Sequence, residues 1–358
     1  MPELDLTATS ADLTRAVCDI PSVSDEEKPL ADMIEAAIRP YAHLEVIRDG
    51  DVIVARTNRG TRQRVVIAGH IDTVPINGNV PTRDIEIDAE PYIWGRGTVD
   101  MKSGLAVQLK LAAELVAPRI DVTWMWYDHE EVDAARNGLN RLSQTRPDLF
   151  AADFAILGEA SNGQVEGGCN GTMRAVVRTH GVRAHSARAW IGENAIHAAA
   201  PVLSRLAEYR PRDVAVEGLV YREGLNAVRV TGGVAGNVIP DVCEVEVNYR
   251  FAPSSSVEQA ADHVRNVFAG FEVEVTDAAA GARPGLDAPL AQEFLSAVGA
   301  QALPKYGWTD VARFSALGIP AVNYGPGDPQ LAHHDEERVP IAQIEAVERG
   351  LRAWLSPS

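Results

Sequence analysis

Histidine and carboxylate side chains recur in this sequence where predicted strands end or predicted helices begin. The residues are His70, Asp72, Asp100, Glu130, Glu131, Glu159 and the pair His333 and His334. Because ligands of an open parallel sheet bind beyond the carboxyl ends of its strands, these side chains are expected to converge at one edge. Imidazole and carboxylate donors without thiolates suit Zn²⁺, with Co²⁺ or Mn²⁺ as substitutes. One carboxylate shared by two ions would make a two-metal hydrolytic centre.

The segment GHIDTVP, residues 69–75, supplies the first two of these donors. In an extended segment residues i and i+2 point to the same side, so His70 and Asp72 face the same way. Asp72 can then accept the second N–H of the imidazole and fix its tautomer, as carboxylates do for metal-bound histidines. The alternative interpretation is an ordinary polar loop.

Asp100 lies in WGRGTVDMKSG, residues 94–104, just before a predicted helix. The glycines indicate close approach of the backbone to a neighbouring group. The segment lacks the third glycine of a dinucleotide loop and the Gly-Lys-Ser/Thr of a phosphate loop, which disfavours nucleotide binding. Asp100 could alternatively serve as a helix N-cap.

The strand at 122–127 is followed by the sequence DHEE, residues 128–131. Adjacent glutamates project to different sides, so one can bind a metal ion while the other faces a substrate water. A solvated acidic loop is the alternative in so acidic a chain. The sequence contains neither a Gly-x-Ser-x-Gly nucleophile segment nor the His-Glu-x-x-His of a zincin.

Composition favours a soluble, cytoplasmic protein. The 358 residues suffice for about two domains. Fifty acidic residues against 33 basic ones give a formal charge of −17, which repels nucleic acid and anionic lipid. No apolar run is long enough to span a bilayer, the acidic N-terminus is unlike a signal peptide, and three cysteines are too few for a disulfide framework. We therefore expect neither a membrane nor a nucleic-acid partner.

Strands alternate with helices at both ends of the chain, which predicts an α/β domain with a mostly parallel sheet. The middle instead follows the β-α-β-β-α-β order of a ferredoxin-like domain. We predict a discontinuous catalytic domain, 1–172 and 282–358, interrupted by an inserted domain at 173–281. The predicted elements are strands 64–68, 122–127, 154–157 and 319–324 with helices 104–116 and 341–355, then strands 173–182, 226–234, 242–251 and 271–276 with helices 194–209 and 257–268.

Together the motifs resemble the family of co-catalytic zinc peptidases and deacylases that includes aminoacylase, acetylornithine deacetylase, carboxypeptidase G and succinyl-diaminopimelate desuccinylase. The resemblance spans about residues 12–347, and its most specific segments are GHIDTVP, GRGTVDMKSG, DHEE, LGEAS, AHSARAWIGENAIH and GNVIP. Within the family, GCNGTMR, KYGWTDVARF and NYGPGDPQLAH are most similar to the actinobacterial type of desuccinylase.

The resemblance implies two Zn²⁺ ions per subunit. Their implied ligands are His70, Asp100 and Glu159 for one ion and Asp100, Glu131 and His333 for the other. Asp100 would bridge the ions and Asp72 would orient His70. Glu130 would act as the general base, taking a proton from the attacking water and delivering it to the leaving amine.

Two histidine assignments depend on the same resemblance. His333 is preferred to His334 because the family's ligand stands four residues before a glutamate, here Glu337. His185 matches the histidine of the family's lid domain, which reaches the partner's active site across a dimer and stabilises the oxyanion. A surface histidine in a loop is the alternative for His185.

The inserted domain is thereby implied to be a lid and dimerisation domain, and the protein a homodimer. Implied contacts to a small N-acylated amino-acid substrate are Asn237, Arg250, Thr309 and Arg313. The planar guanidinium of an arginine pairs with a carboxylate through two hydrogen bonds. A purely structural salt bridge or cap is the alternative for each of these four residues.

The implied reaction is hydrolysis of the amide in N-succinyl-LL-2,6-diaminopimelate, which yields succinate and LL-2,6-diaminopimelate for lysine biosynthesis. The alternatives are acetylornithine deacetylase or another N-acyl-amino-acid deacylase of the family. A non-catalytic binding protein that has lost its metals is disfavoured by the complete set of donors, because a buried acidic cluster without its ions is destabilising.

Overall fold

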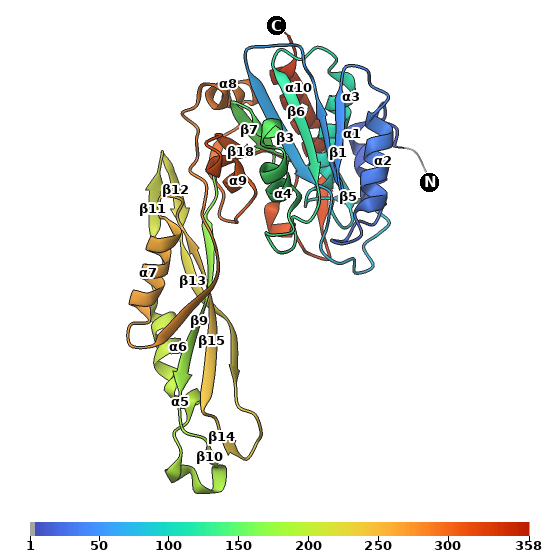
Figure 1. The fold of residues 1–358 in the computed structure, drawn as a ribbon. Helices are drawn as coiled ribbons and strands as arrows, with labels where there is room; N and C mark the ends of the chain where they lie inside the picture. The colour runs from blue at the N-terminus through green and yellow to red at the C-terminus, as the bar shows by residue number, and fades with distance from the viewer. Residues whose placement is uncertain (1–3, 358) are drawn as a thin grey trace. The chain divides into compact units, whose positions relative to one another are not determined.

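The computed structural model describes residues 4–357 and divides the chain into two compact units (Figure 1). Unit 1 comprises Met1–Gly167, Pro284–Leu303 and Arg313–Ser358, and unit 2 comprises Gly168–Arg283 and Pro304–Ala312. Unit 2 contains the predicted insertion, 173–281. It also takes 304–312, a segment that the sequence assigned to the first domain.

Unit 1 is built on an eight-stranded sheet whose central strands β6, β3, β7 and β18 run parallel to one another. Strands β1 and β2 on one side and β8 on the other are antiparallel. In spatial order the strands are β1 (Glu45–Asp49), β2 (Val52–Arg56), β6 (Asp121–Tyr127), β3 (Arg64–His70), β7 (Phe154–Leu157), β18 (Ala321–Asn323), β8 (Val165–Gly167) and β17 (Ala302–Pro304). The predicted α/β class with a mostly parallel sheet is confirmed.

The helices of unit 1 bring the two ends of the chain together. Helices α1, α3 and α10 pack against one another although they come from the N-terminal, middle and C-terminal parts of the sequence (Figure 1). The helices are α1 (Ser10–Cys18), α2 (Lys28–Ile38), α3 (Lys102–Glu114), α4 (Gly138–Thr145), α8 (Pro289–Val298), α9 (Val311–Ala316) and α10 (Ile341–Leu355), with 3₁₀ turns at Pro147–Phe150 and Pro329–Leu331. A small antiparallel sheet comprises β19 (Arg338–Pro340), β5 (Glu90–Trp94) and β4 (Arg83–Ile87).

Unit 2 has the predicted β-α-β-β-α-β order, with its four long strands in one antiparallel sheet ordered β13, β15, β9, β16. These are β9 (Gly171–His180), β13 (Gly224–Gly232), β15 (Val242–Phe251) and β16 (Glu272–Ala279), and the helices are α5 (Ala195–Ala198), α6 (Ala200–Glu208) and α7 (Val257–Val267). Two small pairs, β10 (Ala184–His185) with β14 (Val238–Ile239) and β11 (Asp213–Val216) with β12 (Leu219–Arg222), lie at opposite ends of this unit (Figure 1). A 3₁₀ turn covers Ser186–Ile191.

The single helix predicted over 194–209 is wrong in one respect, since two short helices, α5 and α6, occupy this segment. Pro201 lies in the first turn of α6. Proline lacks the N–H that a continuous helix would need and disfavours helical geometry at the residue before it.

A close contact between α3 and the end of β7 brings two of the candidate donor segments together. A Cβ on Gly104, in the first turn of α3, would collide with the carbonyl oxygen of Gly158. Gln108, one turn later on α3, donates to the carbonyl of Ala68 on β3 at 2.9 Å. The glycine expected to permit close approach therefore seats the helix after Asp100 directly on the strand ends. Across 4–357, no helix is both long and apolar enough for a membrane span.

Candidate metal centre

The carboxyl ends of three adjacent parallel strands supply most of the candidate donors. Strand β3 ends at His70, and its neighbours β6 and β7 end shortly before Glu131 and Glu159. Asp100 precedes α3. His333 reaches the same place from the segment between the last 3₁₀ turn and β19.

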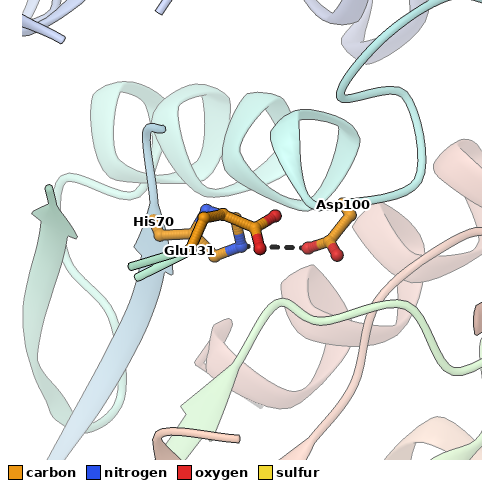
Figure 2. A group of neighbouring side chains, drawn as sticks. All are labelled: His70, Asp100 and Glu131. Carbon is orange, nitrogen blue, oxygen red and sulfur yellow. Dashed lines mark hydrogen bonds and ion pairs between the residues drawn. The ribbon is translucent and has the colours of Figure 1, made fainter. Parts of the chain in front are cut away.

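His70, Asp100 and Glu131 form a tight group. One potential ligand atom from each lies within 4.8 Å of the other two. Figure 2 shows the three side chains pointing toward one another, with His70 and Asp100 joined by a hydrogen bond. Side chains from three separate segments thus present imidazole and carboxylate groups to a common point.

Asp100 directs one carboxylate oxygen at each of two histidines. Its Oδ1 lies 3.0 Å from His70 Nε2, and its Oδ2 lies 3.2 Å from His333 Nε2. Glu131 Oε2 lies 3.0 Å from the same nitrogen of His333, and Glu159 Oε1 lies 3.9 Å from His70 Nε2. The predicted donors therefore fall into two sets that share Asp100.

Burial distinguishes these residues from polar residues in a solvated loop. His70 and Asp72 are both fully buried, and the side chains of Glu131 and Glu159 are 7% and 9% exposed. The N-cap of α3 is Met101, with no side-chain capping bond, so Asp100 does not serve as the cap. His70 and Asp72 therefore do not lie in a solvated loop, and Asp100 is not the N-cap of α3.

Asp72 supports the site differently from the simplest expectation. His70 Nδ1 lies 2.9 Å from the backbone carbonyl of Asp72 and 3.5 Å from its carboxylate, so the carbonyl takes the closer contact. The carboxylate instead accepts the backbone N–H groups of Glu130 at 3.0 Å and Glu131 at 3.1 Å, and the hydroxyl of Ser24 at 2.8 Å. Asp72 therefore holds both the imidazole and the adjacent glutamates, and Ser24 is a supporting residue that the sequence did not indicate.

The electrostatics of the group favour positive partners for its carboxylates. Burial opposes ionisation of Asp100, but hydrogen bonds from His333 and His70 outweigh it and hold the pKa of this carboxyl well below its ordinary value. Hydrogen bonds to Asp100 and Glu131 raise the pKa of His333 to about 10. Burial and the nearby Asp100 carboxylate raise the pKa of Glu131.

The donor set fits a divalent metal ion. A carbonyl oxygen can only accept, so His70 Nδ1 carries a hydrogen, and the Nε2 nitrogen shares a second proton with Asp100 Oδ1 through their hydrogen bond. Two acceptors at this separation need a proton or a cation between them, and metal binding displaces such protons. Oxygen and imidazole ligands without thiolate suit zinc, manganese or cobalt.

Two of the remaining predicted site residues lie together in unit 2. His185 of β10 is exposed, and its Nδ1 accepts the backbone N–H of Ala187 at 3.0 Å. The backbone carbonyl of Asn237 accepts the N–H of Ser186 at 2.9 Å, which places Asn237 beside the same segment. A neutral His185 that accepts at Nδ1 carries its hydrogen on Nε2, so Nε2 is a hydrogen-bond donor.

The other predicted substrate contacts are divided between the units. Arg250 lies on β15 in unit 2, where its Nε donates to Asn248 Oδ1 at 3.1 Å. Thr309 is buried in unit 2, and its carbonyl lies 3.8 Å from the thiol sulfur of Cys169. Arg313 belongs to unit 1 on α9.

The profile of peptidase family M20/M25/M40 matches residues 66–356, which includes all the predicted donors. The chain belongs to this family. A protein of Mycobacterium tuberculosis with the provisional name succinyl-diaminopimelate desuccinylase DapE is 54% identical over 98% of this chain and 99% of its own. A succinyl-diaminopimelate desuccinylase of Corynebacterium glutamicum is 46% identical over 99% of this chain and 98% of its own.

Solved structures share the fold of this protein over nearly the whole chain. A tripeptidase from Staphylococcus aureus has a TM-score of 0.75 at 21% identity and covers 99% of this chain and 98% of its own. A Bacillus subtilis M20 peptidase described as dinuclear and metal-binding has a TM-score of 0.70 at 17% identity, covering 98% of this chain and 97% of its own. At these identities the likeness establishes the fold alone.

Proposed function

We propose that this M20 hydrolase cleaves the amide bond of N-succinyl-LL-2,6-diaminopimelate, releasing succinate and LL-2,6-diaminopimelate. Near-full-length identity of 54% and 46% to two proteins named for this reaction supports the substrate. The geometry that carries a hydrolytic centre is Asp100, which presents one oxygen to His70 and the other to His333.

This geometry supports two divalent ions, with Zn²⁺ the preferred metal and Co²⁺ or Mn²⁺ as substitutes. The proposed ligands are His70, Asp100 and Glu159 for one ion and Asp100, Glu131 and His333 for the other. When bound, such a pair would polarise the scissile carbonyl and lower the pKa of a shared water toward about 7. His333, rather than His334, is the proposed ligand because its Nε2 lies beside both Asp100 and Glu131.

Glu130 is the proposed general base. It lies three residues after the end of β6, and its backbone N–H donates to Asp72 Oδ1, which fixes the chain beside the proposed ligand Glu131. The Glu130 carboxylate would take a proton from the attacking water while the new C–O bond forms. It would return that proton to the leaving nitrogen as the amide C–N bond breaks.

His185 is the proposed donor to the oxyanion, acting from the unit 2 of a partner subunit. The Nε2–H that its contact with Ala187 selects is the group this role requires. Asn237, Arg250, Thr309 and Arg313 are the proposed contacts to the substrate, with the arginines binding its carboxylates.

Unit 2 has the surface expected for the proposed homodimer. Strand β13 is at the edge of its sheet and exposes Val228 and Val230, which are 58% and 51% exposed. Ile196 and Leu203 on the adjacent helices are 43% and 42% exposed. An exposed apolar edge strand favours pairing with another chain, here a second copy.

The substrate assignment is tested by comparing kcat/KM of the Zn²⁺-loaded protein for succinyl-diaminopimelate, acetylornithine and dipeptides. We expect succinyl-diaminopimelate to be preferred. A preference for either competitor would reject the substrate, and a wild-type protein that binds no Zn²⁺ would reject the hydrolytic centre.

The cross-subunit role of His185 is tested by mixing two inactive variants, Glu130→Gln and His185→Ala. A mixed dimer contains one site with both functional residues, so random re-association should restore about one quarter of wild-type activity. No recovery in a demonstrated mixed dimer would reject the assignment, and size-exclusion chromatography would reject the dimer if only monomer eluted.

A further inference from the structure

A buried glutamate holds the turn that carries Asp100. Glu337, immediately before β19, is fully buried. Its Oε1 accepts the backbone N–H of Val99 at 2.7 Å and that of Asp100 at 2.9 Å. One carboxylate oxygen therefore fixes the backbone of the residue proposed to bridge the two metal ions.

Arg96 connects the same carboxylate to the segment that carries His333. Its Nη1 donates to Glu337 Oε2 at 3.0 Å and to the backbone carbonyl of His334 at 3.3 Å. Arg96 is only 4% exposed, so the contact is shielded from water and salt. Through this pair, the segment containing Asp100 is joined to the residue next to His333.

The fold of this region has a separate source of support. Strands β5 and β19 pair antiparallel, with Trp94 opposite Arg338, and the Gly95 N–H donates to the Glu337 carbonyl at 2.9 Å. These backbone bonds hold the two segments together whatever the side chain of Glu337 is. The side-chain contacts of Arg96 and Glu337 additionally fix the positions of the segments that carry Asp100 and His333.

The charge of the pair also suits a site rich in carboxylates. An unpaired carboxylate buried next to Asp100 would be costly in an already acidic cluster. Arg96 supplies the compensating charge through a fixed guanidinium while leaving Asp100 itself to the two histidines.

We propose that Arg96 and Glu337 form a positioning pair that sets Asp100 opposite His333, so that affinity for the metal ion held between them depends on two buried side chains that bind neither metal nor substrate. This inference rests on the proposed two-metal function. Groups that orient metal ligands typically change metal affinity or activity by about 10–100-fold when removed.

The test uses the full-length variants Glu337→Gln and Arg96→Met and their combination. Stepwise Zn²⁺ affinities are measured by competition with a chelating indicator, and the Co²⁺-substituted proteins are compared by visible absorption. We expect each single variant to weaken one of the two Zn²⁺ affinities by about 10–100-fold and to change the Co²⁺ spectrum. Because the residues act as a unit, the double variant should lose little more than the worse single variant.

Asp121→Asn is the matched control. Asp121 is also a buried carboxylate of unit 1 that accepts two backbone N–H groups, from Arg59 and Thr61, with an arginine nearby, but it lies at the opposite end of β6. This variant should keep both Zn²⁺ affinities and the Co²⁺ spectrum. Melting temperatures of the metal-free proteins identify variants that are merely unfolded.

Unchanged Zn²⁺ affinities and Co²⁺ spectra in folded Glu337→Gln and Arg96→Met proteins would overturn the positioning pair. An equal loss of affinity in Asp121→Asn would also overturn it, because the effect would then reflect general destabilisation. Absence of Zn²⁺ binding by the wild type would instead reject the proposed function, which keeps the two failures distinct.

Discussion

Carboxylates lie near both ends of strand β6, but their hydrogen-bond partners differ between the two ends. Asp121, at the start of the strand, accepts hydrogen bonds at 2.9 Å from the Thr57 hydroxyl and from the backbone N–H groups of Arg59 and Thr61. Each of its oxygens meets a donor that the fold itself provides. The hydrogen bonds of this carboxylate hold the loop that follows β2 to the start of β6.

Beyond the other end of β6, the carboxylates of Asp100 and Glu131 face imidazole nitrogens and each other. Both contact His333 Nε2, and Asp100 also contacts His70 Nε2. These groups can be satisfied by protons or by metal cations, so their balance changes with what is bound. The comparison separates a carboxylate whose partners are all supplied by the fold from carboxylates that we propose as metal ligands.

The largest effect is expected for Asp100→Asn. Loss of the shared carboxylate should remove at least one ion and reduce turnover by roughly 10⁴-fold, since bound metals supply several kcal/mol of transition-state stabilisation. Zn²⁺ should raise the melting temperatures of the wild type and of Asp121→Asn. It should raise the melting temperature of Asp100→Asn much less. Elemental analysis, calorimetry and kcat measurements check this. Two Zn²⁺ ions and full activity in Asp100→Asn would abolish the contrast between the two ends.

Glu130→Gln distinguishes two roles among the carboxylates beyond the C-terminal end of β6, because Glu130 is the neighbour of a proposed ligand and not a proposed ligand itself. We expect kcat to fall by about 10²–10⁴-fold, the usual contribution of a general base, with Zn²⁺ content unchanged. Steady-state kinetics on metal-analysed protein provide the measurement. Loss of zinc in this variant would mean that Glu130 is itself a ligand.

Asp121→Asn should affect stability and leave the chemistry intact. Replacing the carboxylate leaves backbone N–H donors facing an amide that cannot accept from all of them, which costs about 1–3 kcal/mol of unfolding free energy. Urea denaturation measures the loss, while kcat and Zn²⁺ content per folded molecule should match those of the wild type. A variant as stable as the wild type would show that these hydrogen bonds contribute nothing net.

The smallest effect concerns pH. Burial opposes ionisation of Asp121, but hydrogen bonds from Arg59, Thr61 and Thr57 outweigh it and lower its pKa. A carboxyl whose pKa is lower in the folded state contributes stability above its unfolded pKa of about 3.9 and loses it as pH falls through the folded value. The unfolding free energy of Asp121→Asn should therefore decline less than that of the wild type below about pH 4. Identical acid-side slopes in urea titrations would contradict the assignment.

The sequence predicted the elements whose patterns are local. Residues 154–157, 242–251 and 341–355 form a strand, a strand and a helix with the predicted bounds. Hydrophobic alternation and helical spacing are set by neighbouring residues, so they can be read along the chain. The prediction was less accurate at 194–209, where Pro201 divides the helix, and at 304–312, which packs with unit 2.

By itself, the sequence determined which segments could provide metal donors, because these segments lie where predicted strands end or a predicted helix begins. The parallel strands that end at or shortly before His70, Glu131 and Glu159 share one edge of the sheet. Only the tertiary structure decided how the donors meet. Glu131 and His333 are 202 residues apart in the chain, and Glu337 is 238 from Val99. Hydrogen bonds over such separations depend on how whole elements pack, and no local periodicity records them. The two directions of the Asp100 carboxylate therefore became visible only in three dimensions.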